Sequence, residues 1–149
     1  MATVFCRDRF AVPREHLSTY IRDSWKPAVE RLNGPVVFVS GRDGTELAEE
    51  NGQHGDILQL DFEDSYRNLT LKMMGIYRFF TENTPVQQIV VINDDTIVNA
   101  TALDQLLRAQ VGSSFVISRA AAAEVLRHVC AFPGFAIHLD DILMGLLTN

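Results

Sequence analysis

The chain has 149 residues, of which 47% are hydrophobic and 21% are charged, and its formal net charge at pH 7 is -6. These values predict a single soluble globular domain, residues 1–149, that is large enough to bury a core. The negative net charge argues against nucleic acid as a partner, because binding to a phosphate backbone requires clustered Lys and Arg.

The cysteine content and the apolar runs limit the setting of the protein. Cys6 and Cys130 are too few for a disulfide framework, although a single bridge is compatible with the sequence. Residues 1–10 do not resemble a signal peptide, because charged residues interrupt them at positions 7–9. No stretch approaches the roughly 20 apolar residues that span a bilayer. We therefore expect no membrane segment in this chain.

The first predicted element is a helix over residues 12–25, in which apolar residues recur at three- and four-residue spacing. These residues are Leu17, Tyr20, Ile21 and Trp25. Pro27 prevents the helix from continuing. Arg22 lies off the apolar stripe. Two roles stay open for it: pairing with Asp23 or Glu30 in solvent, or binding an anion.

Runs of β-branched and apolar residues predict strands that alternate with helices, which is typical of an α/β sheet. The predicted strands are residues 35–40, 56–60, 89–92 and 112–118. Residues 41–44, Gly-Arg-Asp-Gly, follow the first of these strands. This loop either contacts a ribose or phosphate or forms a plain turn, and two glycines at this spacing do not distinguish the two.

The longest predicted helix has an apolar stripe from Tyr66 to Phe80, with Asp64 or Ser65 as its N-cap. Lys72 lies off this stripe. We therefore expect it in solvent, with contact to a phosphate as the alternative. The other predicted helices are a short one that begins with residues 46–50 and is broken at Gly52, and residues 101–110 and 120–129.

Two adjacent carboxylates, Asp94 and Asp95, follow the buried-type strand 89–92. In open α/β sheets, ligands bind outside the carboxyl ends of the strands. Like charges repel, so these acids must be solvated or paired, and a divalent cation that holds a diphosphate would remove the conflict. The alternative is an Asx-type turn or a helix N-cap, and these residues alone leave both interpretations open.

A second acid pair, Asp140 and Asp141, precedes a predicted final helix over residues 142–147. Acidic residues in this position complement the positive end of the helix dipole. This second pair therefore requires no ligand to explain it.

Six motifs occur in an order that resembles glycosyltransferase family 31, the galactosyltransferase-type hexosyltransferases. Residues 20–25, Tyr-Ile-Arg-Asp-Ser-Trp, are similar to the family's Ala-Ile-Arg-x-Thr-Trp helix, and residues 55–72 are similar to its most recognisable line. Asn93-Asp94-Asp95 stands where the family has three aspartates. The remaining motifs are residues 37–41, 113–118 and 139–142. Together the motifs extend over nearly the whole chain.

The resemblance implies a GT-A-like (Rossmann-like) fold, with a mostly parallel sheet flanked by helices. It also implies transfer of galactose or N-acetylglucosamine from a UDP-sugar, with inversion, to a glycan acceptor on a glycoprotein or glycolipid. The implied cofactor is Mn2+ and the implied location is the Golgi. By the same resemblance Asp95 binds the metal. Asn93, Asp94 and Arg22 contact the nucleotide sugar, and Asp141 is the general base.

Several differences from the family pattern predict an abbreviated member. Asn93 replaces an aspartate and removes a charge that helps to hold the cation. Val91 stands where many members have a lysine. Residues 110–112 join a helix directly to the next strand, where the family has a long insert that forms part of the acceptor-binding surface. The chain also ends soon after Asp141. We therefore expect a truncated fold that lacks part of the acceptor-side segment.

Three functions are compatible with this sequence. The first is an active hexosyltransferase, in which Asp94, Asp95 and Asp141 keep their roles. The second is a catalytically inactive remnant or fragment that keeps only the nucleotide-binding fold. The third is magnesium-dependent phosphoryl chemistry at the acidic loop, which leaves the other five motifs unexplained.

Overall fold

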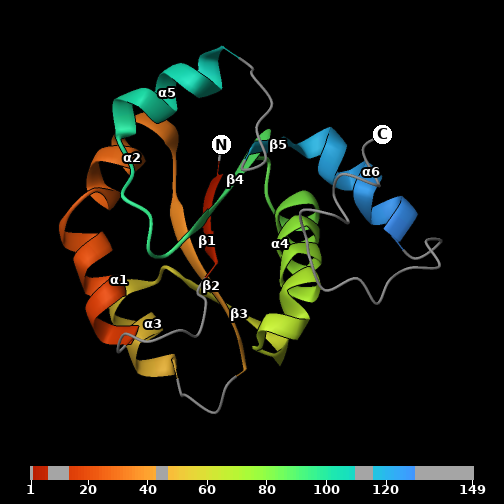
Figure 1. Ribbon diagram of the computed structural model, residues 1–149, viewed down its shortest axis with the longest axis horizontal. Coiled ribbons are helices and arrows are strands. Elements are labelled where there is room, and N and C mark those ends of the chain that lie inside the picture. The colour runs from red at the N-terminus through yellow and green to blue at the C-terminus, as the bar shows by residue number, and fades with distance from the viewer. Residues whose placement is uncertain (1, 7–13, 43–46, 110–115, 130–149) are drawn as a thin grey trace.

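The centre of the fold is a five-stranded sheet with the strand order β3-β2-β1-β4-β5 (Figure 1). A computed structural model describes residues 2–6, 14–42, 47–109 and 116–129 of the chain. The strands are β1 (Ala2–Cys6), β2 (Val36–Arg42), β3 (Ile57–Glu63), β4 (Gln88–Asn93) and β5 (Val116–Ser118). β1, β2, β3 and β4 run parallel, and β5 pairs antiparallel with β4 at one edge. The predicted α/β class and mostly parallel sheet are therefore confirmed.

The sequence did not lead us to predict β1, although this strand lies in the middle of the sheet. Its residues, Ala-Thr-Val-Phe-Cys, include β-branched and aromatic types that favour strands. The expectation for residues 1–10 was only that they are no signal peptide, because charged residues interrupt them at positions 7–9. In the structure β1 pairs with β2 on one side and with β4 on the other.

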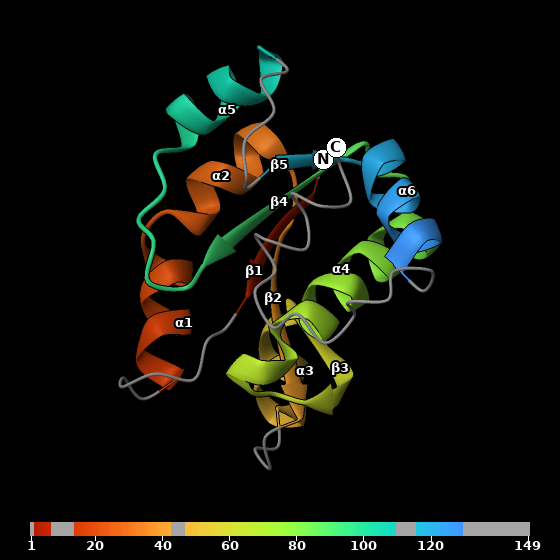
Figure 2. The same ribbon diagram turned by 45° about the vertical axis from the view of Figure 1, so that its right-hand side comes forward.

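Helices cover both faces of the sheet, as Figures 1 and 2 show from two directions. One face carries α1 (Arg14–Asp23), α2 (Lys26–Asn33) and α5 (Ala100–Arg108). The other carries α4 (Leu69–Asn83), which a 3-10 turn precedes, and α6 (Arg119–Val129). The remaining helix, α3 (Ala48–His54), leads into β3. The helices thus bury apolar side chains of the sheet on both sides.

Alternating side chains of β2 and β4 supply both halves of the core. Val36 and Phe38 pack with α1, α2 and α5, whereas Val39 and Ile89 pack with α4 and α6. This alternation follows from the two-residue period of a strand. Each fully buried side chain of this size contributes about 1.5–3 kcal/mol to folding. The packed sheet therefore holds in position the loops that leave the carboxyl ends of its strands.

The helices near Pro27 and Gly52 differ from the prediction. A second helix, α2, starts at Lys26 and carries Pro27 in its first turn, where a missing N–H costs no hydrogen bond. The predicted break of α3 at Gly52 is wrong, because the helix continues to His54 and ends at Gly55. Gly55 has a φ of 63°, and this left-handed conformation suits glycine at the end of a helix.

Within the described ranges, no helix combines the length and the apolar character that crossing a membrane requires.

Candidate functional site

The predicted acidic turn lies at the carboxyl end of β4, as expected. Asn93 is the last residue of β4, and Asp94 and Asp95 form the turn that follows. The amide of Thr96 donates to the carbonyl of Asn93 at 3.2 Å and closes this turn. Asn93 and Asp95 are exposed and Asp94 is half-buried. The structure therefore brings these three predicted site residues together at one edge of the sheet.

The strand order makes the carboxyl ends of β1 and β4 the expected place for a ligand. From β1 the chain proceeds to β2 and β3 on one side, and β4 then pairs with the other side of β1. The direction of strand order reverses between β1 and β4, and ligands of open α/β sheets bind in the crevice at such a switch point. Asn93 lies beside Cys6 in the pairing of β4 with β1. The acidic turn is thus at the switch point.

The far end of the same loop is also fixed. Asn99 is the N-cap of α5, and its side-chain oxygen accepts a hydrogen bond from the amide of Ala102 at 3.0 Å. Capping by Asn satisfies an amide that has no partner within the helix. Between β4 and α5, Asp94 and Asp95 therefore lie on a short connection that is anchored at both ends.

The carboxylates of this turn have the chemistry that a hard divalent cation requires. The side chain of Asp95 is exposed and makes no hydrogen bond or ion pair with the described part of the chain. Mg2+ and Mn2+ accept carboxylate oxygens and are often held by one or two carboxylates together with water and substrate phosphates. Among the described residues, no group of three or more His, Cys, Asp or Glu is placed to hold a metal ion. The described residues therefore offer two neighbouring carboxylates on this turn, Asp94 and Asp95, and no complete metal site.

A buried ion pair lies near the carboxyl ends of β2 and β3. Lys72 of α4 is 1% exposed, and its Nζ is 2.8 Å from Oδ1 of Asp64. The prediction that Lys72 is solvated is wrong. The prediction that Asp64 or Ser65 caps the helix is also wrong, because Asn68 occupies the N-cap position.

Asp64 holds the end of β2 through its second carboxylate oxygen. Oδ2 of Asp64 accepts hydrogen bonds from the amide of Gly41 at 2.8 Å and from the hydroxyl of Ser40 at 3.2 Å. The amide of Asp64 donates in turn to the carbonyl of Arg42 at 2.8 Å. We call Asp64, Lys72, Ser40 and Gly41 the Asp64 clamp. This clamp ties β2 to the segment that follows β3.

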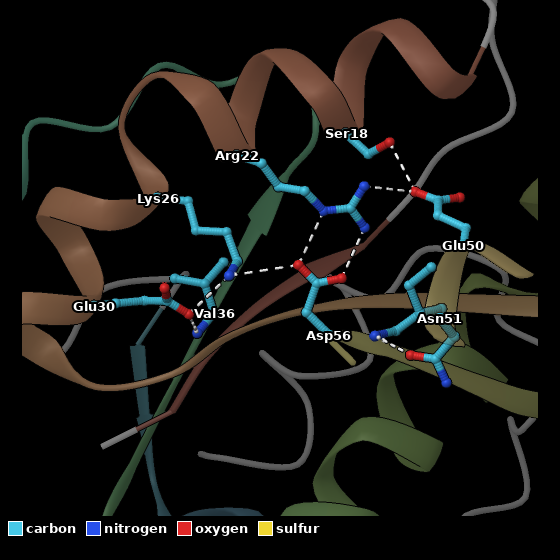
Figure 3. A network of polar contacts seen from close by, with 9 residues as sticks. Ser18, Arg22, Lys26, Glu30, Val36, Glu50, Asn51 and Asp56 are labelled. Carbon is cyan, nitrogen blue, oxygen red and sulfur yellow. Dashed lines mark hydrogen bonds and ion pairs between the residues drawn. The ribbon is translucent and has the colours of Figure 1, made fainter. Parts of the chain in front are cut away.

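Arg22 belongs to a different set of contacts, shown in Figure 3. Its Nε and one terminal nitrogen donate to the two oxygens of Asp56 at 3.0 and 2.7 Å, and the other terminal nitrogen donates to Glu50 at 2.8 Å. The guanidinium also lies 4.8 Å from the centre of the Phe38 ring. Contacts with Asp23 or Glu30, which the sequence suggested, are replaced by these. The predicted role of Arg22 in binding a nucleotide sugar stays a prediction, but its donors are engaged within the protein.

Lys26 extends this set of contacts to the start of β2 (Figure 3). Its Nζ is 2.9 Å from Glu30 and 3.4 Å from Asp56. Glu30 also accepts a hydrogen bond from the amide of Val36, the first residue of β2, at 3.2 Å. We call Arg22, Lys26, Glu30, Glu50 and Asp56 the amino-end network, because they surround the amino ends of β2 and β3.

The amino-end network also lowers the pKa of Asp56. Burial by itself raises the pKa of Asp56, but the hydrogen bonds and charges of Arg22 and Lys26 outweigh burial and hold that pKa below its usual value. A lowered carboxyl pKa means that the folded state favours the ionised form. Asp56 is therefore a charged, paired group that stabilises the fold at neutral pH.

The clamp residues and Asp56 were missed as functional or structural partners by reasoning from the sequence. Periodicity placed Lys72 outside the apolar stripe of α4, and nothing in the spacing revealed the carboxylate that meets it. The signal that could have found the pair is the separation of Asp64 and Lys72 by eight positions around a predicted helix start.

Asp141, the predicted general base, lies outside the described residues, as do residues 112–115 of the fourth predicted strand.

Comparison with known proteins matches most of the chain to one family. The family model described as Galactosyltransferase matches residues 18–130. This range contains the acidic turn, the Asp64 clamp and the amino-end network.

Individual relatives match shorter segments. The rat beta-1,3-galactosyltransferase 4 is 34% identical over 110 residues, which cover 67% of this chain and 29% of the relative. The mouse beta-1,3-galactosyltransferase 5 is 44% identical over 98 residues, which cover 58% of this chain and 31% of the relative. The human beta-1,3-galactosyltransferase 4 is 42% identical over 59 residues, which cover 40% of this chain and 16% of the relative. The matched segments thus span less than a third of the length of these relatives.

Proposed function

This chain belongs to the galactosyltransferase family, and from that premise we propose that it is a hexosyltransferase domain with a GT-A-like fold. The proposed reaction transfers galactose or N-acetylglucosamine from a UDP-sugar to a glycan acceptor on a glycoprotein or glycolipid, with inversion. The proposed location is the Golgi. The observation that carries the proposal is the position of Asn93, Asp94 and Asp95 at the switch point of the sheet.

The acidic turn would hold the donor. Asp95 is the proposed metal ligand, because its exposed carboxylate lies on an anchored turn and is available to a cation. When bound, Mn2+ would neutralise negative charge on the diphosphate leaving group. Asn93 and Asp94 would contact the ribose and the donor sugar, with Asn93 contributing an amide in place of a charge.

The acceptor side of the reaction requires a base. We assign this role to Asp141, whose carboxylate would take the proton of the acceptor hydroxyl as the new glycosidic bond forms. For Arg22 we propose a supporting role in place of direct contact with the nucleotide sugar. Because its donors bind Asp56 and Glu50, it would act by holding α1 in place beside the sheet.

The first test is calorimetric titration of the purified chain with UDP, with and without Mn2+. We expect binding that requires the metal and that disappears in Asp95→Ala. The matched control is Glu49→Ala, which removes an exposed carboxylate from α3 and is expected to leave binding unchanged. Absence of UDP binding by the folded, unaltered chain would contradict the proposal.

A transfer assay then tests the chemistry. A screen of UDP-sugars and glycan acceptors should show turnover that Asp141→Ala reduces by about 100-fold or more, the usual contribution of a general base. Metal-dependent UDP binding without any turnover would instead support a second function, a nucleotide-binding domain without transferase activity. The observation that favours this alternative is the short connection at residues 110–112, where the family has a long insert that forms part of the acceptor-binding surface.

A further inference from the structure

The carboxyl end of β2 lies on the same edge of the sheet as the acidic turn. Val39 of β2 and Asn93 of β4 both pair with Cys6 of β1, so they lie at one level of the sheet. β2 then continues through Ser40, Gly41 and Arg42, past the level at which β4 ends. Two strand spacings, about 10 Å, separate β2 from β4. A nucleotide held at the acidic turn could therefore extend across β1 to reach this end of β2.

Buried polar contacts hold the carboxyl end of β2 in addition to its pairing in the sheet. Asp64 is buried and accepts hydrogen bonds from Ser40 and Gly41, while Lys72 neutralises its charge from within α4. An uncompensated carboxylate is costly to bury, and the charge of Lys72, 2.8 Å away, offsets that cost. These contacts fix the backbone of residues 40–42 in one arrangement.

The space around Gly41 shows how closely this segment is packed. A Cβ at Gly41 would lie 2.8 Å from the carbonyl oxygen of Phe62 and 2.9 Å from its ring. Only glycine therefore allows β2 to approach the end of β3 in this way. At this point the pairing of β2 with β3 shifts in register between Ser40 and Arg42. Irregular strand ends of this kind redirect the chain beside functional sites.

We propose that Asp64, held by Lys72, is a positioning residue that fixes residues 40–42 as the nucleoside-side wall of the donor site. The inference rests on the proposed function, because it requires a nucleotide at the acidic turn. Asp64 and Lys72 are buried and act through the backbone of β2. The metal and diphosphate are bound separately, at Asp95.

The test compares the binding of two ligands, UDP and inorganic pyrophosphate, in the presence of Mn2+. Ser40→Ala removes one donor to Asp64 with little change in volume, and the hydroxyl's proton is shared with the carbonyl of Gly41, 3.0 Å away. We expect the Kd for UDP to rise about 3- to 10-fold in Ser40→Ala, the effect of one hydrogen bond. In Lys72→Met we expect a rise of about tenfold or more, as for loss of a supporting contact. The Kd for pyrophosphate should stay unchanged, because that ligand lacks the nucleoside.

Glu30→Gln is the matched control, because Glu30 accepts from a β2 amide and pairs with a lysine at the opposite end of the strand. It should change neither Kd. All titrations are made at a temperature at which urea unfolding shows that the variants are folded. If Lys72→Met does not fold, the Kd of Ser40→Ala for UDP decides the test. Equal weakening of UDP and pyrophosphate, or an unchanged Kd for UDP in Ser40→Ala, would overturn the positioning role and leave the proposed function intact. No binding of either ligand by the unaltered protein would overturn both.

Discussion

Each end of β2 is held by a carboxylate that accepts a hydrogen bond from a β2 amide and pairs with a lysine, but the two ion pairs differ in their exposure to water. At the amino end, Glu30 accepts from the amide of Val36 and pairs with Lys26; at the carboxyl end, Asp64 accepts from the amide of Gly41 and pairs with Lys72. The side chains of the first pair are 13% and 36% exposed, and those of the second are 1% and 6% exposed. Water screens the attraction between exposed charges, so breaking an exposed pair costs little free energy. Breaking a buried pair costs much more, because it leaves a buried charge without its partner. Similar contacts should therefore differ greatly in their contribution to stability.

The largest effect is expected for Lys72→Met. This change leaves Asp64 buried without its partner, and loss of one member of a buried pair typically costs about 3–5 kcal/mol. The free energy of unfolding from urea titration measures the effect. Lys26→Met at the other end of β2 should cost less, about 1 kcal/mol, because its pair with Glu30 is partly solvated and Asp56, its second partner, keeps both hydrogen bonds from Arg22. Equal costs for the two variants would refute the contrast between the ends of the strand.

The next effect concerns Asp56 and depends on pH. Its folded-state pKa is lowered, so its contribution to stability is present above the unfolded value of about 3.9 and is lost as pH falls through the folded value. Asp56→Asn should cost about 1.5–3 kcal/mol at pH 7, the range for hydrogen bonds to a charged group. This cost should shrink as pH falls below about 4. Urea unfolding of both proteins at pH 7, 5 and 3 measures the change. A cost that is independent of pH would show that the charge of Asp56 contributes nothing.

A smaller effect is expected at Gly41, where close packing rather than an ion pair opposes substitution. Gly41→Ala would force the new methyl group against Phe62, and overpacking of this kind costs about 1–3 kcal/mol. Gly52→Ala provides the opposite case, because Gly52 lies inside α3 with no atom within 4 Å of its added Cβ. That change should stabilise the protein by about 1 kcal/mol through helix propensity. Thermal unfolding of the two variants should shift the midpoint in opposite directions.

These contacts explain which parts of the molecule the sequence could predict. The strands β2, β3 and β4 were predictable because each contains a short run of apolar residues. The place of Asp94 and Asp95 followed from the strand before them. Lys72 was not predictable, because a charged residue off the apolar stripe of a helix is usually solvated and its partner lies in another element. The position of the acidic turn was thus easier to predict than the buried contacts at the end of β2.

The same reasoning applies to the motifs that carry the family resemblance. Arg22, in the motif at residues 20–25, pairs with Asp56, in the motif at residues 55–72. Asp64 and Lys72 lie in that second motif and pair with each other. These residues link α1, β2, β3 and α4 into one frame. Resemblance at such positions therefore indicates a shared fold, whereas the proposed donor binding depends on Asn93, Asp94 and Asp95.

The smallest effect, and the one that sharpens the comparison most, is expected for Glu30→Gln. The amide oxygen of Gln can still accept from Val36, while the charge that attracts Lys26 is lost. A partly exposed pair of this type contributes about 0.2–1 kcal/mol, so we expect a cost near the lower limit in 0.15 M salt. At low ionic strength the cost should rise, because screening of exposed charges weakens as salt is removed. Lys72→Met should show little of this salt dependence, since water and ions do not reach its pair. If both variants responded equally to salt, burial would not be what separates the two ends of β2.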